Sequence, residues 1–275
     1  MEQLVATVRG VKVSYSITNR EASETIIFLH GFTGSSKTWV PIIEQLPDSV
    51  RCITVDLMGH GKTDSPSDAN RYIMYEQVMD LHELFLFLNV TNFSLVGYSM
   101  GGRIALAYAL AFPKHVKRLV LESASPGLQS EADRLARITA DEKLAKKMES
   151  EGLSSFIDFW QDIPLFHSQK KLGEIKLHSI REERMQQAVS GLANSLKGMG
   201  TGRQPSYWSR LNELKITVII ITGELDEKFT IIAKQITELI RYSQHLEVSG
   251  AGHAIHVENP VQFATIILEQ VLERF

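Results

Sequence analysis

Short runs of β-branched residues alternate with helix-length segments along most of the chain, and this alternation constrains the fold more than any other feature. The first two runs are close enough to form a hairpin. Later runs are separated by segments such as YEQVMDLHELFLFLNV, whose length suits a helical crossover between parallel strands. We predict an α/β fold with an eight-stranded, mostly parallel sheet, formed by LVATVRG, VKVSYSI, TIIFLH, CITVDL, FSLVG, RLVLES, TVIIITG and HLEVSG.

The alternation is interrupted between residues 123 and 214. Strand signals cease there, and charged helical segments begin with SEADRLARITADEKLAKKMES. We predict that residues 123–214 form a helical cap inserted into a core made of residues 1–122 and 215–275. No repeat or Gly/Ser-rich linker accompanies the insertion, so we expect the cap to be held by its own packing on the core.

Composition narrows the ligand class and the compartment. The 275 residues carry a formal net charge of −3, which gives no overall attraction for nucleic acid or an anionic membrane. The N-terminus lacks a signal-peptide pattern and no apolar window is long enough to cross a bilayer, so we expect a cytoplasmic protein without membrane insertion. The single cysteine, Cys52, lies in an apolar run and is expected to be a buried hydrophobe. No oligomeric state follows from the sequence.

The segment LVGYSMGGRIA, residues 95–105, contains the pattern G-x-S-x-G between Gly97 and Gly101. An apolar strand precedes it and the helical segment GGRIALAYALAF follows, which is the context of a strained strand-to-helix turn that exposes a serine hydroxyl. Ser99 is therefore predicted to be a reactive residue. It could attack a carbonyl carbon, or it could act only as a base that moves a proton.

A second glycine-rich loop, HGFTGSS, follows the strand TIIFLH. Its glycines permit a close turn, and the backbone N–H of Phe32 could join that of Met100 in holding an oxyanion. Both loops follow the carboxyl ends of predicted strands, where open α/β sheets bind their ligands.

Two further candidates follow late strands: Asp226 in TGELDEKF and His253 in GAGHAIHVENP. A serine hydroxyl is almost wholly protonated, so His253 is expected to accept its proton while Asp226 fixes the histidine tautomer. Some alternatives remain open. Glu122 or Glu224 could supply the carboxylate, His256 could be an ordinary helix-end histidine, and His30 and His60 are interpreted as turn residues.

The motifs HGFTGSS, DLMGHGKTD, LVGYSMGGR, TGELDEKF and GAGHAIHVENP together resemble those of the α/β-hydrolase superfamily. The resemblance covers the chain outside the cap. This superfamily includes esterases, carbon–carbon hydrolases, dehalogenases and lyases, so the fold alone selects no reaction.

The elbow and the cap together carry a narrower resemblance. The features that carry it are GYSMGGR, the segment SPGLQ followed by Arg134 and Arg137, Trp160 four residues before Pro164, and Arg181. They resemble the 2-succinyl-6-hydroxy-2,4-cyclohexadiene-1-carboxylate synthases of menaquinone biosynthesis. That family implies a lyase that eliminates pyruvate from a cyclohexene bearing a succinyl ketone, an enolpyruvyl ether and a ring carboxylate, with no cofactor or metal. Residue by residue, the resemblance implies a triad of Ser99, Asp226 and His253, oxyanion amides of Phe32 and Met100, carboxylate-binding Arg103, Arg137 and Arg181, and pocket aromatics Tyr98 and Trp160.

The arginines also make physical sense from their positions. Arg103 lies four residues after Ser99, in the first helical turn beyond the elbow, where its guanidinium could bind a carboxylate bidentately. In the cap, Arg134 and Arg184 lie about one helical turn from Arg137 and Arg181 and could exchange roles with them. Several arginines together favour a small polycarboxylate substrate, because charge-assisted hydrogen bonds can replace its lost hydration.

Two rival functions use the same residues. A carboxylesterase or carbon–carbon hydrolase would act through an acyl-enzyme or an activated water. A non-catalytic ligand receptor would use the same residues for binding alone. The sequence also leaves open whether Ser99 or His253 removes the proton directly.

Overall fold

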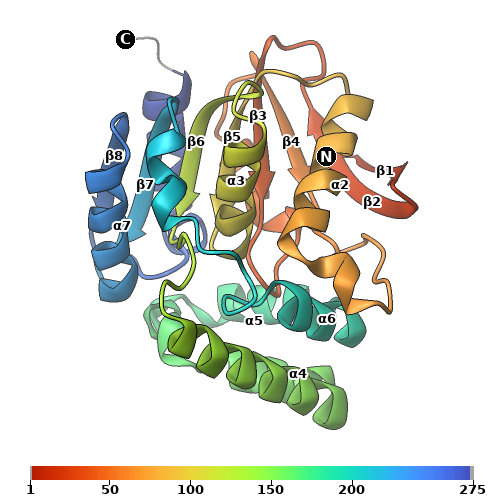
Figure 1. The fold of residues 1–275 in the computed structure, drawn as a ribbon. Helices are drawn as coiled ribbons and strands as arrows, with labels where there is room; N and C mark the ends of the chain where they lie inside the picture. The colour runs from red at the N-terminus through yellow and green to blue at the C-terminus, as the bar shows by residue number, and fades with distance from the viewer. Residues whose placement is uncertain (1, 273–275) are drawn as a thin grey trace.

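The computed structural model describes residues 2–272, in which eight strands form one sheet (Figure 1). Their order is β1-β2-β4-β3-β5-β6-β7-β8, with β2 antiparallel to β1 and β4 and all other neighbours parallel. The predicted α/β class and mostly parallel eight-stranded sheet are therefore confirmed. The strands are β1 (Gln3–Val8), β2 (Val11–Thr18), β3 (Glu24–Leu29), β4 (Val50–Val55), β5 (Phe93–Tyr98), β6 (Val116–Glu122), β7 (Thr217–Gly223) and β8 (Ser243–Val248).

Both faces of the sheet are buried, which explains why the strands read as continuous apolar runs. In β3, Ile27 and Leu29 belong to one buried cluster, while Ile26 and Phe28 belong to the other. The first face is covered by α2 (Met74–Phe87), α3 (Met100–Ala111) and α7 (Glu227–Leu239). The second face is covered by η1 (Ser36–Trp39), α1 (Val40–Ile43), α8 (Ile255–Glu258), α9 (Pro260–Ile267) and η5 (Leu268–Leu272).

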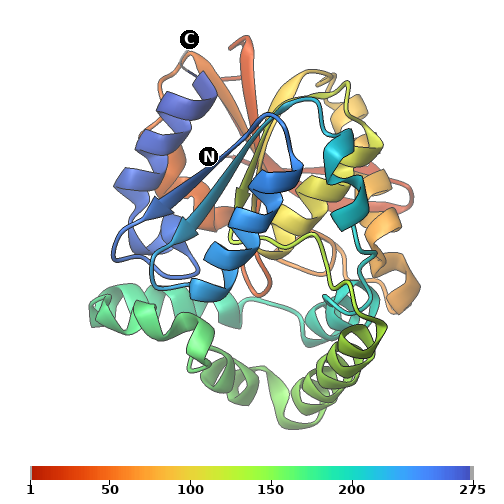
Figure 2. The ribbon, with the colours of Figure 1, turned by 60° about the vertical axis from the view of Figure 1, so that its left-hand side comes forward.

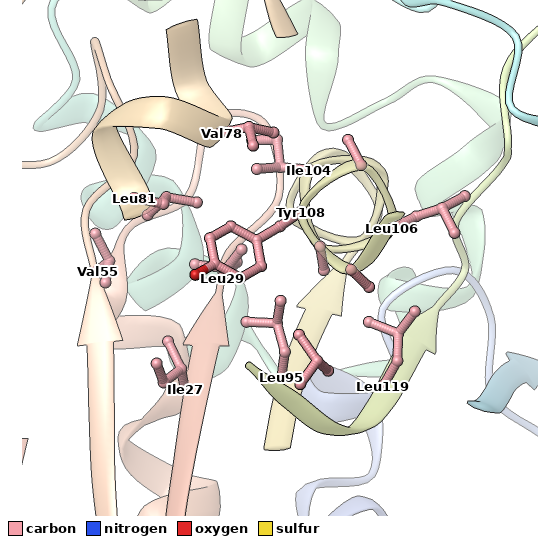
Figure 3. Close-up of a cluster of buried hydrophobic side chains, with 14 of the residues drawn as sticks. Ile27, Leu29, Val55, Val78, Leu81, Leu95, Ile104, Leu106, Tyr108 and Leu119 are labelled. Carbon is pink, nitrogen blue, oxygen red and sulfur yellow. The ribbon is translucent and has the colours of Figure 1, made fainter. Parts of the chain in front are cut away.

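Helix α3 is the element that follows the predicted elbow, and its position is set by packing on the sheet. Ile104 and Tyr108 of this helix belong to one buried cluster with Ile27, Leu95 and Leu119 of the strands (Figure 3). All five side chains are at most 1% exposed. Burying an aliphatic or aromatic side chain contributes roughly 1.5–3 kcal/mol, so these contacts hold the start of α3 firmly against β5.

Most of the chain between β6 and β7 is helical, and its helices lie together across the carboxyl ends of the parallel strands (Figures 1 and 2). Gly152 has φ 83° and ψ 169°, and this left-handed residue bends the long helix α4. The elements are α4 (Glu131–Trp160), η3 (Pro164–Lys171), α5 (Glu174–Met185), α6 (Val189–Met199) and η4 (Trp208–Glu213). Together with η2 (Ala69–Tyr72), they complete the helical elements of the described residues.

Helix α6 packs directly on the core. A Cβ at Gly198 would lie 2.5 Å from the carbonyl oxygen of Ala69, so only glycine permits this approach. The Nδ2 of Asn194 donates to the carbonyl oxygens of Pro66 (3.0 Å) and Ser67 (3.2 Å). The other side of α6 joins α4 in a separate buried apolar cluster. These contacts fix α6 on residues 66–72 of the core.

The structure also bears on the predicted burial of Cys52 and on membrane-spanning helices. Cys52 is 1% exposed within β4, as predicted for a buried hydrophobe. Within residues 2–272, no helix combines the length and the apolar character that crossing a membrane requires.

Candidate active site

Ser99 lies on a sharp turn between β5 and α3. Its φ is 48°, in the left-handed region that L-residues rarely adopt, and its backbone N–H donates to the carbonyl oxygen of Glu122 at 2.8 Å. Glycines on either side allow the turn to close. A Cβ at Gly97 would lie 2.5 Å from the carbonyl oxygen of Gly101, and a Cβ at Gly101 would overlap the carbonyl oxygen of Leu29. The predicted elbow is thus present as a strained backbone turn.

Ser99, His253 and Asp226 form a continuous hydrogen-bonded chain. The Ser99 Oγ lies 3.0 Å from His253 Nε2, and His253 Nδ1 lies 2.6 Å from Asp226 Oδ2. His253 is 1% exposed and Asp226 is 7% exposed. A carboxylate only accepts hydrogen bonds, so Nδ1 carries a hydrogen and Nε2 of the neutral ring is left to accept from the serine hydroxyl. The structure brings together the three residues that the sequence singled out.

The alternative carboxylates lie elsewhere. Glu122 is fully buried, and its Oε1 accepts from the backbone N–H (3.0 Å) and the ring Nδ1 (2.9 Å) of His256. The Nε2 of His256 lies 2.9 Å from Thr38 Oγ1, so this histidine is part of an internal network rather than an ordinary helix-end residue. Glu224 accepts from Ser249 Oγ and from the backbone of residue 250 on the surface. Of the three carboxylates, it is that of Asp226 that accepts a hydrogen bond from His253.

His30 and His60 lie in loops but are buried, which the interpretation as turn residues did not foresee. The backbone N–H of Leu57 donates to His30 Nε2 at 3.0 Å, and the two imidazole centroids are 5.3 Å apart. Burial lowers the pKa of His30 and lowers the pKa of His60 to about 3. His60 packs edge-on against Phe32, with centroids 5.7 Å apart, so these neutral rings support the loop that contains Phe32.

Two backbone N–H groups are available near Ser99. Met100 is the first residue of α3, so its N–H has no acceptor within the helix. Across the described part of the chain, no hydrogen bond engages the N–H of Phe32 either. Both residues line the same pocket as Ser99. This arrangement could hold a developing oxyanion, since the helix N-terminus also favours negative charge.

The pocket above Ser99 is lined by aromatic and cationic side chains. Trp160 contacts Phe32 edge-on with centroids 5.4 Å apart, and its indole Nε1 is buried without a hydrogen-bond partner among residues 2–272. Burial, reinforced by the charge of Glu122, holds the pKa of Tyr98 well above its usual range, so its hydroxyl stays protonated. The lining includes Phe32, Tyr98, Ser99, Met100, Arg103, Arg137, Trp160, Phe166, Lys228 and His253.

Arg103 is a half-buried cation of the pocket. Its Nη1 donates to the carbonyl oxygen of Met199 at 2.8 Å and to Gln204 Oε1 at 2.9 Å, which fixes the side chain. Burial, together with the charge of Arg137, lowers the pKa of Arg103 to about 10. The guanidinium therefore remains charged at neutral pH. It lies in the same pocket as Ser99, as its position four residues later in the chain predicted.

In the first cap helix, the structure distinguishes the two arginines that the sequence left interchangeable. Arg137 lines the pocket and donates from Nε to Asp141 Oδ1 at 2.8 Å. Arg134 instead donates from Nε to the carbonyl oxygen of Gly202 at 3.3 Å. Arg137 is therefore the one of the pair that lines the pocket of Ser99.

In α5, the structure does not bring Arg181 to this pocket. Its Nε donates to Asp158 Oδ1 at 2.9 Å and its Nη2 to Ser154 Oγ at 3.0 Å, so it faces the bend of α4 and lines a separate hollow of the cap. Arg184, one turn later, is only 8% exposed and lies 4.8 Å from the ring centroid of Phe166. Its Nη1 is buried without a partner in the described residues. Arg184 lines a pocket that shares Phe32, Tyr98 and Phe166 with the triad pocket.

Sequence reasoning missed three residues of the site. Phe229 packs on His253 with centroids 4.6 Å apart, and Lys228 lines the pocket. Lys228 and Phe229 lie two and three positions after Asp226 in TGELDEKF, so their place near a candidate acid was a usable signal. Phe166 has no such signal in the sequence. It lies in η3, between α4 and α5, and reaches His253 only through the tertiary packing of that element.

Comparison with known proteins agrees with this geometry. Residues 24–260 match the model of the alpha/beta hydrolase fold family. The chain belongs to the α/β-hydrolase fold family. It is 45% identical over 94% of both chains to a Bacillus subtilis (strain 168) protein provisionally named as a 2-succinyl-6-hydroxy-2,4-cyclohexadiene-1-carboxylate synthase. An Enterobacter sp. (strain 638) protein of that name is 31% identical over 89% of this chain and 90% of its own.

A solved structure of MenH from S. aureus superimposes with a TM-score of 0.89, at 38% identity, over 93% of this chain and 96% of that one. The chain therefore belongs, within the α/β-hydrolase fold, to the 2-succinyl-6-hydroxy-2,4-cyclohexadiene-1-carboxylate synthase family. Other solved structures, such as an enol-lactonase from Burkholderia xenovorans LB400 at 19% identity and a TM-score of 0.84, share the fold.

Proposed function

We propose that the chain is a carbon–oxygen lyase of menaquinone biosynthesis, which eliminates pyruvate from 2-succinyl-5-enolpyruvyl-6-hydroxy-3-cyclohexene-1-carboxylate. The product is 2-succinyl-6-hydroxy-2,4-cyclohexadiene-1-carboxylate, the compound in the names of its relatives. One observation carries the proposal: a Ser–His–Asp chain lies in a pocket that Arg103 and Arg137 also line. An esterase acting on neutral substrates has no need of such cations.

The first step is removal of a proton from the ring carbon next to the succinyl ketone. Asp226 holds the Nδ1–H of His253, whose Nε2 takes the Ser99 proton, and the serine oxygen then accepts the ring proton. The electrons of the broken C–H bond move onto the ketone oxygen. The resulting enolate is stabilised by the N–H groups of Phe32 and Met100.

The second step breaks the carbon–oxygen bond to the enolpyruvyl group. As the enolate carbonyl re-forms, the electron pair shifts the ring double bond and expels the enolpyruvyl oxygen. The released enolpyruvate takes up one proton and becomes pyruvate. All atoms of the substrate are recovered in the two products, so this route needs neither water nor a covalent bond to Ser99.

The substrate carries three carboxylates, and the arginines account for them. Arg103 and Arg137 line the triad pocket, and Arg184 lines the pocket next to it. Each guanidinium can form charge-assisted hydrogen bonds that replace the lost hydration of a buried carboxylate. The neutral hydroxyl of Tyr98 adds a donor at the same pocket, as does the indole N–H of Trp160, which has no partner among residues 2–272. We propose Arg184, in place of Arg181, as the second cap arginine of the site.

A hydrolase is the second candidate, because the same triad and oxyanion amides would support attack of Ser99 on a carbonyl carbon. A carboxylesterase or carbon–carbon hydrolase would pass through an acyl-enzyme or an activated water and place a solvent oxygen in its product. A ligand receptor, by contrast, would release no product over many turnovers. These differences separate the three functions experimentally.

The test is a coupled assay of pyruvate release from the enolpyruvyl substrate, with Ser99→Ala as control. We expect multiple turnovers by the parent protein and loss of most of the rate in the variant. A rate equal to that of the uncatalysed reaction would reject the proposal. The proposal includes action in the cytoplasm on a small molecule, without nucleic acid or membrane insertion; fractionation of the source cells tests the location.

A further inference from the structure

Asp141 is a buried carboxylate of α4 that lies behind the pocket. The residue is 3% exposed, and its Oδ1 accepts from Arg137 Nε at 2.8 Å. Its Oδ2 is buried and has no hydrogen-bond partner within residues 2–272. Burying a carboxylate lowers the stability of the fold unless neighbouring groups stabilise its charge. A buried carboxylate beside a pocket arginine is therefore expected to have a role at the pocket.

The contact determines how Arg137 presents its guanidinium. Asp141 engages only Nε, so the two terminal nitrogens of Arg137 are not used by this ion pair. The Arg137 side chain is 39% exposed and would otherwise be free to sample many rotamers. Because Arg137 lines the triad pocket, an anchored Nε directs the free nitrogens toward a ligand carboxylate.

The Asp141 carboxylate has the cations Arg137 and Arg103 on one side and the backbone at Gly200 on the other. Burial, together with the charge of Arg137, lowers the pKa of Arg103, and the charge of Asp141 opposes that effect. On the other side, a Cβ at Gly200 would overlap Asp141 Oδ2, which shows how tightly the end of α6 covers the carboxylate. Asp141 is thus held in place by α6 while it holds Arg137.

We propose that Asp141 is a positioning residue, which fixes Arg137 through its Nε so that the terminal guanidinium nitrogens bind a substrate carboxylate. The inference rests on the proposed function, since it requires an anionic substrate in the pocket. It goes beyond that function because Asp141 touches the arginine and not the substrate. Its effect therefore has to pass through Arg137.

A double-mutant cycle tests this relation with the enolpyruvyl tricarboxylate as substrate. We expect Asp141→Ala to raise KM about tenfold while kcat changes less than threefold, because ground-state binding is weakened and the triad is untouched. In an Arg137→Ala background the same change should leave KM unaltered. Asp141→Asn retains an acceptor oxygen for Nε and should recover KM to within about threefold of the parent.

A matched control removes another i,i+4 ion pair of the same helix. Lys147 and Glu151 are 3.1 Å apart on the exposed face of α4, so Glu151→Ala should leave KM and kcat unchanged. Circular dichroism and Tm establish that each variant is folded. Should Asp141→Ala fail to fold, Asp141→Asn completes the same cycle, and its smaller KM increase has to vanish in the Arg137→Ala background.

The outcomes are distinguishable. If Asp141→Ala raises KM equally with and without Arg137, the carboxylate acts on the fold alone and the inference is overturned. If Asp141→Ala leaves KM unchanged while Arg137→Ala raises it, the inference also fails, but the proposed recognition by arginine stands. If Arg137→Ala itself has no effect on KM, the role of Arg137 in the proposed function is wrong, and the inference about Asp141 fails with it.

Discussion

His253 Nδ1 lies 2.6 Å from Asp226 Oδ2, although the two residues follow different strands and are 27 positions apart in the chain. Both side chains are buried, so the hydrogen bond is shielded from solvent. The contact fixes the orientation of the imidazole, with Nε2 directed at Ser99 Oγ 3.0 Å away. The three residues are therefore expected to act as one unit rather than as three separate contributions.

The first prediction follows from that unit. Ser99→Ala and His253→Ala should each lower kcat for pyruvate release by about 10²- to 10⁴-fold, the usual range for loss of a positioned base. The double variant should be little worse than either single variant, because the second change removes a group that has already lost its partner. Steady-state kinetics on folded protein check this. Near-parental turnover by Ser99→Ala would show that Ser99 is not the base and that His253 removes the proton directly.

The second prediction separates two arginines of α5. Arg184→Ala should lower kcat/KM for the tricarboxylate, because it removes a buried cation whose Nη1 has no protein partner among the described residues. Truncating one side of a buried charged contact costs roughly 2–5 kcal/mol, or about thirtyfold to several thousandfold in kcat/KM. Arg181→Ala is the matched control. It removes an exposed ion pair with Asp158 and should stay within about threefold of the parent.

A neutral substrate provides the control for that pair of variants. Any slow turnover of a small uncharged ester uses the triad without the arginines, so Arg184→Ala should preserve it. Loss of both activities would mean that Arg184 supports the fold of the pocket. If instead Arg181→Ala shows the large loss and Arg184→Ala does not, the assignment of the second cap arginine has to be reversed.

The third prediction concerns acid stability. Burial lowers the pKa of His60 to about 3, whereas its value in an unfolded chain is about 6.5. Between these values the unfolded state binds more protons, so the free energy of unfolding falls as the pH falls below about 6.5. The loss from this one group is about 2 kcal/mol between pH 7 and pH 5.

Urea unfolding at the two pH values measures that loss. In His60→Gln the difference in the free energy of unfolding between pH 7 and pH 5 should shrink by about 2 kcal/mol. His30 has a lowered pKa for the same reason and should retain its own contribution in that variant. An unchanged difference would show that His60 becomes protonated in the folded protein without cost.

Much of the fold could be predicted because it depends on local patterns. The strands are apolar on both faces and the elbow glycines tolerate no side chain, so both features are written in neighbouring residues. The assignment of Asp226 over Glu122 is different in kind. Asp226 follows β7 and Glu122 is the last residue of β6, and only the tertiary structure shows that Glu122 already accepts hydrogen bonds from His256.

The cap arginines were the hardest to assign for a related reason. Arg181 and Arg184 are three residues apart on one helix, and the sequence does not determine which side of that helix faces the core. The structure decides it through contacts distant in the chain: Asp158 and Ser154 engage Arg181, while Phe166 underlies Arg184. Residues that reach a site through such packing have no signal in a single sequence.

The fourth prediction addresses the chemical role of Ser99. If the serine acts as a base, no covalent bond to the substrate forms at any stage of the reaction. Mass spectrometry of protein quenched during turnover should therefore show the unmodified mass, with and without excess substrate. A substrate-derived adduct on the peptide that contains Ser99 would assign a nucleophilic mechanism.

The most direct test of the elimination is the fate of solvent oxygen during turnover of the enolpyruvyl substrate in ¹⁸O-labelled water. We expect pyruvate and the cyclohexadiene product to form in equal amounts, and the carboxylates of the cyclohexadiene to contain no solvent oxygen. Both products should disappear together in Ser99→Ala. Release of succinate that carries a solvent oxygen would instead show that this triad hydrolyses the succinyl ketone of its substrate, and would contradict the assignment as a lyase.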